Sequence, residues 1–274
     1  MQKIIRLQNL LTFVTESSHS SFYKKHFGTS MNHKEVRTYE DLALLPSISK
    51  NDLLQTPLSD RLYIPTGRGL VKVVDSGTHS FLIKRVLSEL REEQFGNLGE
   101  RPTVLFSNGH ESLEKSLWCY EQNTLPMIGE STNIPITEYF VHRYESDSFL
   151  GDIKTLESIF EQSKDAFLPG SQFTLCEGGF DLVRIKKHVP LDSTTLILSF
   201  PEVGACAHSC PYHLKNNRLV FHPDKNSIIE HDTNLTVTKL IAMPTPIIRY
   251  ITDVPSKTEE YSCDCKEEVS FSLT

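Results

Sequence analysis

Apolar residues recur at three- and four-residue spacing along the first sixteen positions of the chain. Four of them would share one helical face: Ile4, Leu7, Leu11 and Val14. This spacing predicts an amphipathic helix near the N-terminus. A short helix should follow over residues 38–45, and another from residue 50. Ser49 and Asp52 favour the latter, because they stand at capping-box spacing.

From residue 69 onward, strand-like and helix-like patterns alternate. A β-branched run predicts a strand at residues 71–74, and residues 81–94 have the pattern of an amphipathic helix. The further elements expected in this part are strands at 103–106, 172–176 and 195–200 and a helix at 152–163. Such alternation indicates α/β layering. Strands and turns dominate later, with strands expected at 218–221, 227–230, 235–241 and 247–251.

Composition and charge narrow the classes of partner. The chain has 274 residues, of which 38% are hydrophobic and 23% charged, ordinary values for a folded, soluble protein. The net charge of −7 comes without a basic block, which argues against nucleic acid and anionic membranes as partners. The longest apolar runs are too short to cross a bilayer, and the N-terminus lacks a signal-peptide core. We therefore expect a cytoplasmic protein.

Six cysteines, at positions 119, 176, 206, 210, 263 and 265, should be reduced in that compartment. The isolated pair at 119 and 176 is expected to be buried. The other four form two close pairs, which indicate either metal binding or burial. Two thiols and two imidazoles lie within eight residues and could bind one ion locally: Cys206, His208, Cys210 and His213.

Two N-terminal segments carry a family resemblance. Residues 20–27 read SSFYKKHF, and residues 39–53 read YEDLALLPSISKNDL. They resemble the (N/S)xxFYxxxF and xEDLxxLPxxxKxDL segments of the phenylacetate–CoA ligase-like branch of the adenylate-forming (acyl-CoA synthetase) superfamily. This match covers Arg6 to Gln55, and a second match runs from Pro246 to Cys265.

The resemblance implies nucleotide-binding residues at two turns that follow strands. Ser76, Gly77 and Thr78 match the start of the family's phosphate loop, SSGTTGKPT, whose second glycine and lysine are replaced here. That loop needs glycines for close backbone approach to phosphate and a cation for its charge. Glu177 and Gly178 stand where the family has its adenine-binding turn.

Three further site residues come from the same resemblance. Glu202 stands at the Mg²⁺-binding glutamate of the family's YGxSE motif, without the tyrosine that flanks the adenine. The segment PIIRYITD at 246–253 resembles xPLIRYRTGD, so Arg249 would reach phosphate. Asp253 is either the ribose-binding aspartate after a one-residue deletion or a replacement of the motif's glycine. The implied catalytic residues are thus Glu202 and Arg249.

Many members of this branch also hold a structural zinc between a Cys/His segment and a late CxC pair. The matching residues here are Cys210, His222, Cys263 and Cys265. Three thiolates and one imidazole make a sensible tetrahedral zinc site. His213 is the alternative to His222 as the imidazole ligand.

The expected fold is α/β, a shortened N-terminal core of an adenylate-forming ligase with a strand-rich C-terminal part clasped by zinc. The core should occupy residues 1–205 and the zinc-binding subdomain residues 206–274. The resemblance ends near residue 265, so the family's mobile C-terminal catalytic domain is expected to be absent.

Three functions are open at this point, and the sequence does not decide whether the chain is an enzyme. The first is a divergent adenylate-forming ligase-like protein that acts on or binds a small carboxylic acid or its acyl-adenylate or thioester, with ATP and Mg²⁺. The second is a catalytically degenerate, zinc-stabilised scaffold or binding module, a pseudoenzyme. The third is an acyltransferase that takes a pre-activated acyl donor, with Cys206 as acceptor. A partner protein or a homodimer would cover apolar surface left by the missing domain.

Overall fold

The computed structural model describes residues 2–28, 32–64, 69–75, 80–86, 98, 101–106, 110–129, 134–163, 165–241, 243–256, 263, 265 and 270–273. The α-helices are α1 (Gln2–Glu16), α2 (Phe22–Phe27), α3 (Tyr39–Ala43), α4 (Lys50–Gln55), α5 (Leu58–Arg61), α7 (His110–Glu121), α8 (Ile134–Arg143), α9 (Ile153–Gln162), α10 (Leu182–Lys186) and α11 (Pro211–Lys215). Short 3₁₀ turns cover His33–Glu35 and Leu191–Ser193. Within these ranges, no helix combines the length and the apolar character that crossing a membrane requires.

Thirteen strands are described, and they form three sheets. Their bounds are β1 (Gly69–Asp75), β2 (Ser80–Val86), β3 (Thr103–Phe106), β4 (Pro126–Ile128), β5 (Ser148–Gly151), β6 (Gln172–Glu177), β7 (Thr194–Phe200), β8 (Gly204–Ser209), β9 (Val220–Pro223), β10 (Ser227–His231), β11 (Asn234–Lys239), β12 (Tyr250–Pro255) and β13 (Phe271–Ser272).

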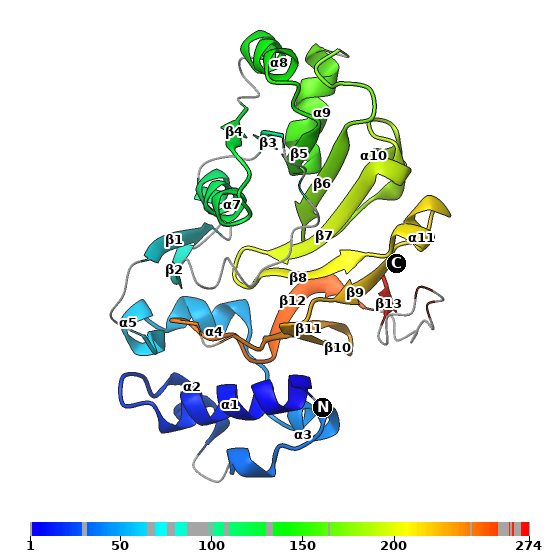
Figure 1. Ribbon diagram of the computed structural model, residues 1–274. Helices are drawn as coiled ribbons and strands as arrows, with labels where there is room; N and C mark the ends of the chain where they lie inside the picture. Colours follow the sequence, from blue (N-terminus) through cyan, green and yellow to red (C-terminus); the bar gives the residue numbers. More distant parts are fainter. Residues whose placement is uncertain are drawn as a thin grey trace.

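The largest sheet has eight strands in the order β13-β9-β8-β7-β6-β5-β3-β4 (Figure 1). From β7 to β4 its neighbours are parallel, because helices α7 to α10 return the chain between successive strands. Strands β8, β9 and β13 continue the sheet in antiparallel fashion. Strands β3 and β5 inside the parallel part are buried on both faces, as expected for strands that helices cover on either side, whereas β4 at the edge is not.

Side-chain alternation along β3 shows how the two faces are filled. Leu105 packs in a small cluster with Trp118 of α7. Phe106 points to the opposite face, where its ring stacks on Phe149 of β5 at a centroid distance of 5.6 Å. Gly151 sits opposite Phe106, and a Cβ there would lie 2.0 Å from the Phe106 carbonyl oxygen. This close approach explains why a glycine ends β5.

The second sheet, β10-β11-β12, lies between the large sheet and the N-terminal helices (Figure 1). Helix α1 buries Leu7, Leu11 and Val14 of its predicted apolar face, and its Lys3 donates to the carbonyls of Asp224 and Ser227. The buried Tyr23 of α2 donates its hydroxyl to the Pro246 carbonyl and accepts from the Ile248 amide. The two ends of the family resemblance therefore contact each other directly.

Several predicted elements are confirmed. The N-terminal helix is α1, and complete capping boxes start α3 and α4 at Thr38 and Ser49. The helix expected at 152–163 is α9, and Asp152 caps it through the Thr155 amide. The strands expected in the α/β part are β1, β3, β6 and β7.

The helix expected over 81–94 is wrong for the residues that the structure describes. Residues 80–86 form β2, which pairs antiparallel with β1 in unbroken register from Gly69↔Val86 to Asp75↔Ser80. Backbone pairing with β1 overrode the helical period of a short apolar segment. The strand expected at 247–251 starts only at Tyr250, because Arg249 adopts a left-handed backbone conformation with φ of 51°.

The domain boundary expected at 205/206 falls inside a strand. Strand β8 runs from Gly204 to Ser209 and hydrogen-bonds to β7 on one side and β9 on the other. The eight-stranded sheet thus contains residues from both sides of that boundary, whereas β10, β11 and β12 lie wholly in the later part.

Candidate metal centre and motif junction

Three thiols and one imidazole meet beside β9, the second strand from one edge of the large sheet. The ligand atoms of Cys210, His222, Cys263 and Cys265 all lie within 4.8 Å of one another, and we call this set the thiol–imidazole cluster. The Cys210 and Cys263 sulfurs are 3.4 Å apart, and the Cys265 sulfur lies 3.1 Å from His222 Nε2. These are the four residues for which the sequence predicts a metal site.

Local structure explains why distant segments meet at the cluster. Cys210 precedes α11, and its amide donates to the Val220 carbonyl at 2.7 Å, which holds it against β9. His222 lies in the middle of β9. The C-terminal segment returns to the same strand because β13 pairs with β9 through Phe271↔Phe221. Cys263 and Cys265 lie a few residues before that pairing.

The structure distinguishes the two histidines that the sequence left open. Among the described residues, the imidazole in the cluster is that of His222. His213 lies on α11 and is also buried, with 6% of its surface exposed. The alternative local metal site does not form. It would use Cys206, His208, Cys210 and His213, but Cys206 points into the core and donates to the Leu198 carbonyl.

The chemistry of the cluster suits a thiophilic divalent metal. Burial, followed by the neighbouring thiol of Cys265, raises the pKa of Cys263 to about 12. Three sulfurs and one imidazole nitrogen are the donor set of tetrahedral zinc sites. A tetrahedral ion with bonds of ~2.3 Å would hold sulfurs ~3.8 Å apart. The Cys263 and Cys265 sulfurs, 2.7 Å apart, would therefore spread on binding.

The second group of residues is the motif junction, which we define as Lys50, Glu202, Glu230, Arg249 and Tyr250. Glu202 follows the end of β7 and is buried, with 4% exposed. The buried Tyr250 hydroxyl donates to its carboxylate, and the Lys50 ammonium lies 4.0 Å from it. Burial, and after it the Glu202 charge, raise the pKa of Tyr250 far above its ordinary value.

Arg249 is bonded to the fold through both its side chain and its backbone. Its Nε donates to both carboxylate oxygens of Glu230, at 3.2 and 3.1 Å, and its NH1 donates to the Leu45 carbonyl after α3. Its backbone amide donates to Thr238, and its carbonyl accepts from the Ile48 amide. Burial raises the pKa of Glu230 even though Arg249 opposes that shift. Two of the three guanidinium nitrogens, Nε and NH1, thus have protein partners.

Glu177 and Gly178 share one edge of the sheet with Glu202. Glu177 is the last residue of β6, and Gly178 follows it. Because β6 runs parallel to β7, these residues and Glu202 lie at the carboxyl ends of adjacent strands, where α/β proteins bind ligands. The Glu177 carboxylate accepts from the Ile153 amide at 2.7 Å and so caps α9. Burial raises its pKa. A side chain at Gly178 would contact the Phe200 ring, 3.2 Å away.

The remaining predicted residues do not join this group. Asp253 is exposed on β12, on the solvent side of the small sheet. Ser76, Gly77 and Thr78 lie outside the described residues, between β1 and β2. In the sequence, Lys50 is part of the N-terminal segment at 39–53 and was not predicted as a site residue. No signal in the sequence indicated Glu230 as the partner of Arg249.

Cys206, the acceptor in the acyltransferase hypothesis, is not accessible. It is fully buried in the core between β7 and β9. A thiol with no exposed surface cannot meet an acyl donor unless the sheet opens.

Comparisons with known proteins bear on the fold. No protein-family model matches the chain, and no curated protein sequence matches it. Among solved structures, the AMP-forming acyl-CoA synthetase/AMP-acid ligase II-like protein from Dyadobacter fermentans DSM 18053 matches with a TM-score of 0.55 at 12% identity, over 80% of this chain and 65% of that one.

Two further solved structures match over shorter parts. The amide bond synthetase McbA from Marinactinospora thermotolerans matches with a TM-score of 0.49 at 9% identity, over 63% of this chain and 40% of its own. The o-succinylbenzoate CoA synthetase MenE from Bacillus subtilis matches with a TM-score of 0.48 at 12% identity, over 63% of this chain and 40% of its own.

The likeness to the Dyadobacter fermentans protein shows a mixed α/β fold similar to the core of an adenylate-forming ligase. The chain spans between 40% and 65% of the length of these three proteins. They do not distinguish the phenylacetate–CoA ligase branch from the rest of the superfamily.

Proposed function

We propose that the chain is a metal-stabilised protein of adenylate-forming ligase fold that binds a small carboxylic acid or its acyl derivative and does not adenylate it. The observation that carries this proposal is the motif junction. Glu202 and Arg249, which the resemblance assigns to Mg²⁺ and phosphate, are each bonded to protein side chains there. Glu177 likewise caps a helix.

The energetics favour this interpretation over a working adenylation site. Adenylation depends on charges that are preorganised for the triphosphate and for pyrophosphate as it leaves. An arginine with a buried carboxylate partner must break that pair before it reaches a phosphate, which leaves a buried charge without compensation. The binding role rests on the ligase fold and on the carboxyl-end edge formed by β6 and β7.

The experiment that tests the proposal measures nucleotide binding and exchange together. Titration calorimetry with ATP and Mg²⁺ should show no binding, and a panel of carboxylic acids should support no pyrophosphate exchange. The same acids and their CoA thioesters should stabilise the protein against heat. Acid-dependent exchange would overturn the proposal in favour of a divergent ligase.

We also propose that the metal at the thiol–imidazole cluster is zinc and that its role is structural. The donor set fits zinc, and the cluster ties the C-terminal segment to β9. Elemental analysis should find one zinc per chain. The pair Cys263→Ser and Cys265→Ser should remove it and lower the melting temperature. The matched control is Cys119→Ser with Cys176→Ser, two buried cysteines outside the cluster, which should keep the zinc. Zinc retained by the Cys263/Cys265 double variant would refute the assignment.

A further inference from the structure

The opposite edge of the large sheet carries a surface that neither the metal nor the junction explains. Strand β4 ends the sheet there, while the thiol–imidazole cluster lies near the other end, at β9. Six large apolar residues of β4, its N-terminal approach and α8 are 37–62% exposed: Leu125, Ile128, Ile136, Tyr139, Phe140 and Tyr144. We call these six residues the edge surface.

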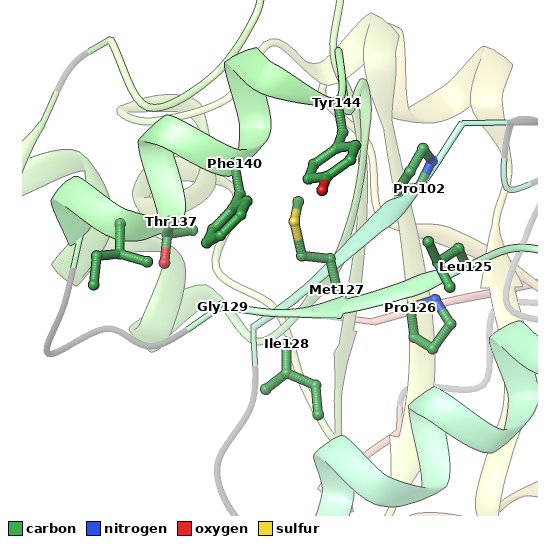
Figure 2. A pocket seen from close by; sticks show the side chains of 10 residues that line it. Pro102, Leu125, Pro126, Met127, Ile128, Gly129, Thr137, Phe140 and Tyr144 are labelled. Carbon is green, nitrogen blue, oxygen red and sulfur yellow. The ribbon is translucent and has the colours of Figure 1, made fainter.

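Three rings of the edge surface contact one another. Phe140 touches Tyr139 edge-on at a centroid distance of 5.3 Å and stacks on Tyr144 at 5.9 Å, so the end of α8 and the residue after it present a row of rings. Between this row and β4 lies a groove of about 490 Å³, lined almost entirely by apolar side chains. Figure 2 shows Met127 rising from β4 between Phe140 and Tyr144.

The area of this surface lies between that of an ordinary monomer patch and that of one side of a standard interface. A fully exposed large side chain presents roughly 200 Å², so the exposed fractions amount to about 650 Å² in total. A single apolar patch on a monomer is typically about 300–600 Å², whereas each partner of a standard interface contributes about 800 Å². Tyrosine, phenylalanine and methionine are also the residue types enriched at such interfaces.

The backbone of β4 limits how a partner can dock. The Leu125 carbonyl and the Gly129 amide bond to β3, so the alternate residues Pro126 and Ile128 direct their backbone groups to the outer edge. Proline has no N–H, which leaves the Ile128 amide as the one outward donor of this three-residue strand. Strand addition is therefore disfavoured, and contact must come through side chains.

The rim of the edge surface carries both signs of charge. Arg101 lies 3.6 Å from Glu145 and 3.7 Å from Asp147, and Arg143 is exposed at the end of α8. A rim with one sign would repel a copy of itself, whereas a mixed rim is compatible with two-fold self-association.

We propose that the edge surface is the contact between two copies of this chain. In a two-fold arrangement α8 packs antiparallel against the α8 of the second copy, and the ring row of each copy covers the groove of the other. The sheet does not continue across the contact, because Pro126 interrupts the outer edge of β4. The contact is independent of the metal cluster and of ligand binding.

Sedimentation velocity on the full chain tests this proposal. The wild-type protein should dimerise between about 1 and 100 µM. Ile136→Glu and Ile128→Glu, both at exposed positions, should each raise the dimer dissociation constant at least tenfold. The matched control is Leu44→Glu. Leu44 directly follows α3 and is 83% exposed, so this change should leave the dissociation constant unchanged.

Each other outcome overturns the proposal. A wild-type chain that stays monomeric throughout, or a dimer insensitive to both edge variants, removes the edge surface as the contact. Hydrogen exchange provides a second measurement, since amides of α8 should gain protection as the concentration rises. If the chain is monomeric and an apolar dye binds in a manner that Ile136→Glu abolishes, the groove is a small-molecule site instead.

Discussion

Replacing Glu202 distinguishes a structural carboxylate from a catalytic one. If the residue serves the fold, Glu202→Ala leaves the buried Tyr250 hydroxyl without its acceptor and the Lys50 ammonium without its partner. If the residue awaited a metal ion instead, its removal would relieve a buried charge and leave stability unchanged or higher. The two interpretations therefore predict opposite signs.

The geometry of the junction sets the magnitude. A hydrogen bond to a charged acceptor contributes about 1.5–3 kcal/mol, and Tyr250 is only 3% exposed, so water cannot replace Glu202. The Lys50 side chain is 29% exposed and 4.0 Å away, so its pair adds at most about 1 kcal/mol. Glu202→Ala should thus lower the free energy of unfolding by about 2–4 kcal/mol.

Urea unfolding of a double-mutant cycle measures this effect. The cycle combines Glu202→Ala with Tyr250→Phe, and we expect a coupling of about 1.5–3 kcal/mol between them. Lys50→Met serves as the control, with an expected loss below about 1 kcal/mol. A coupling under about 0.5 kcal/mol, or a stabilising Glu202→Ala, would refute the assignment of Glu202 to the fold.

Three other predictions use the same unfolding assay. Lys239→Met should lower the free energy of unfolding by about 3–5 kcal/mol, because it leaves the buried Asp224 carboxylate without the ammonium 3.1 Å away. Adding Asp224→Asn should recover much of that loss. Burial raises the folded pKa of Glu177 above its ordinary value of 4.5, so wild-type stability relative to Glu177→Gln should fall as the pH rises from about 4 to 7, and a flat difference would contradict this. Gly151→Ala should lower the free energy of unfolding by about 3 kcal/mol or more, because the new Cβ would collide with the Phe106 carbonyl. A loss below about 1 kcal/mol would show that β5 shifts easily.

Local chemistry explains which elements could be predicted from the sequence. Capping boxes at Ser49 and Thr38 work within four residues, so α3 and α4 start where their side chains dictate. The β-branched run that became β1 and the apolar run that became β7 needed no distant partner to be recognised.

Tertiary pairing explains most of what could not be predicted. Residues 81–86 have a helical period, but β1 supplies a complete hydrogen-bonded register, and they form a strand. The exposed β4 and the ring row at the end of α8 look like ordinary amphipathic segments until the sheet order shows that, among the described strands, none pairs beyond β4. The partner of Arg249 was hidden for the same reason, because Glu230 lies 19 residues away on another strand.

The segments that carry the resemblance are those that bind one another. Tyr23 of the N-terminal motif bonds to Pro246 and Ile248 of the late one, and Arg249 bonds to the Leu45 carbonyl between them. These contacts join the N-terminal helices to the segment between β11 and β12. A resemblance that is strongest in such segments therefore indicates the fold and is neutral about the reaction. The chemistry has to be read from what each charged group touches, and Glu202, Arg249 and Glu177 all touch protein.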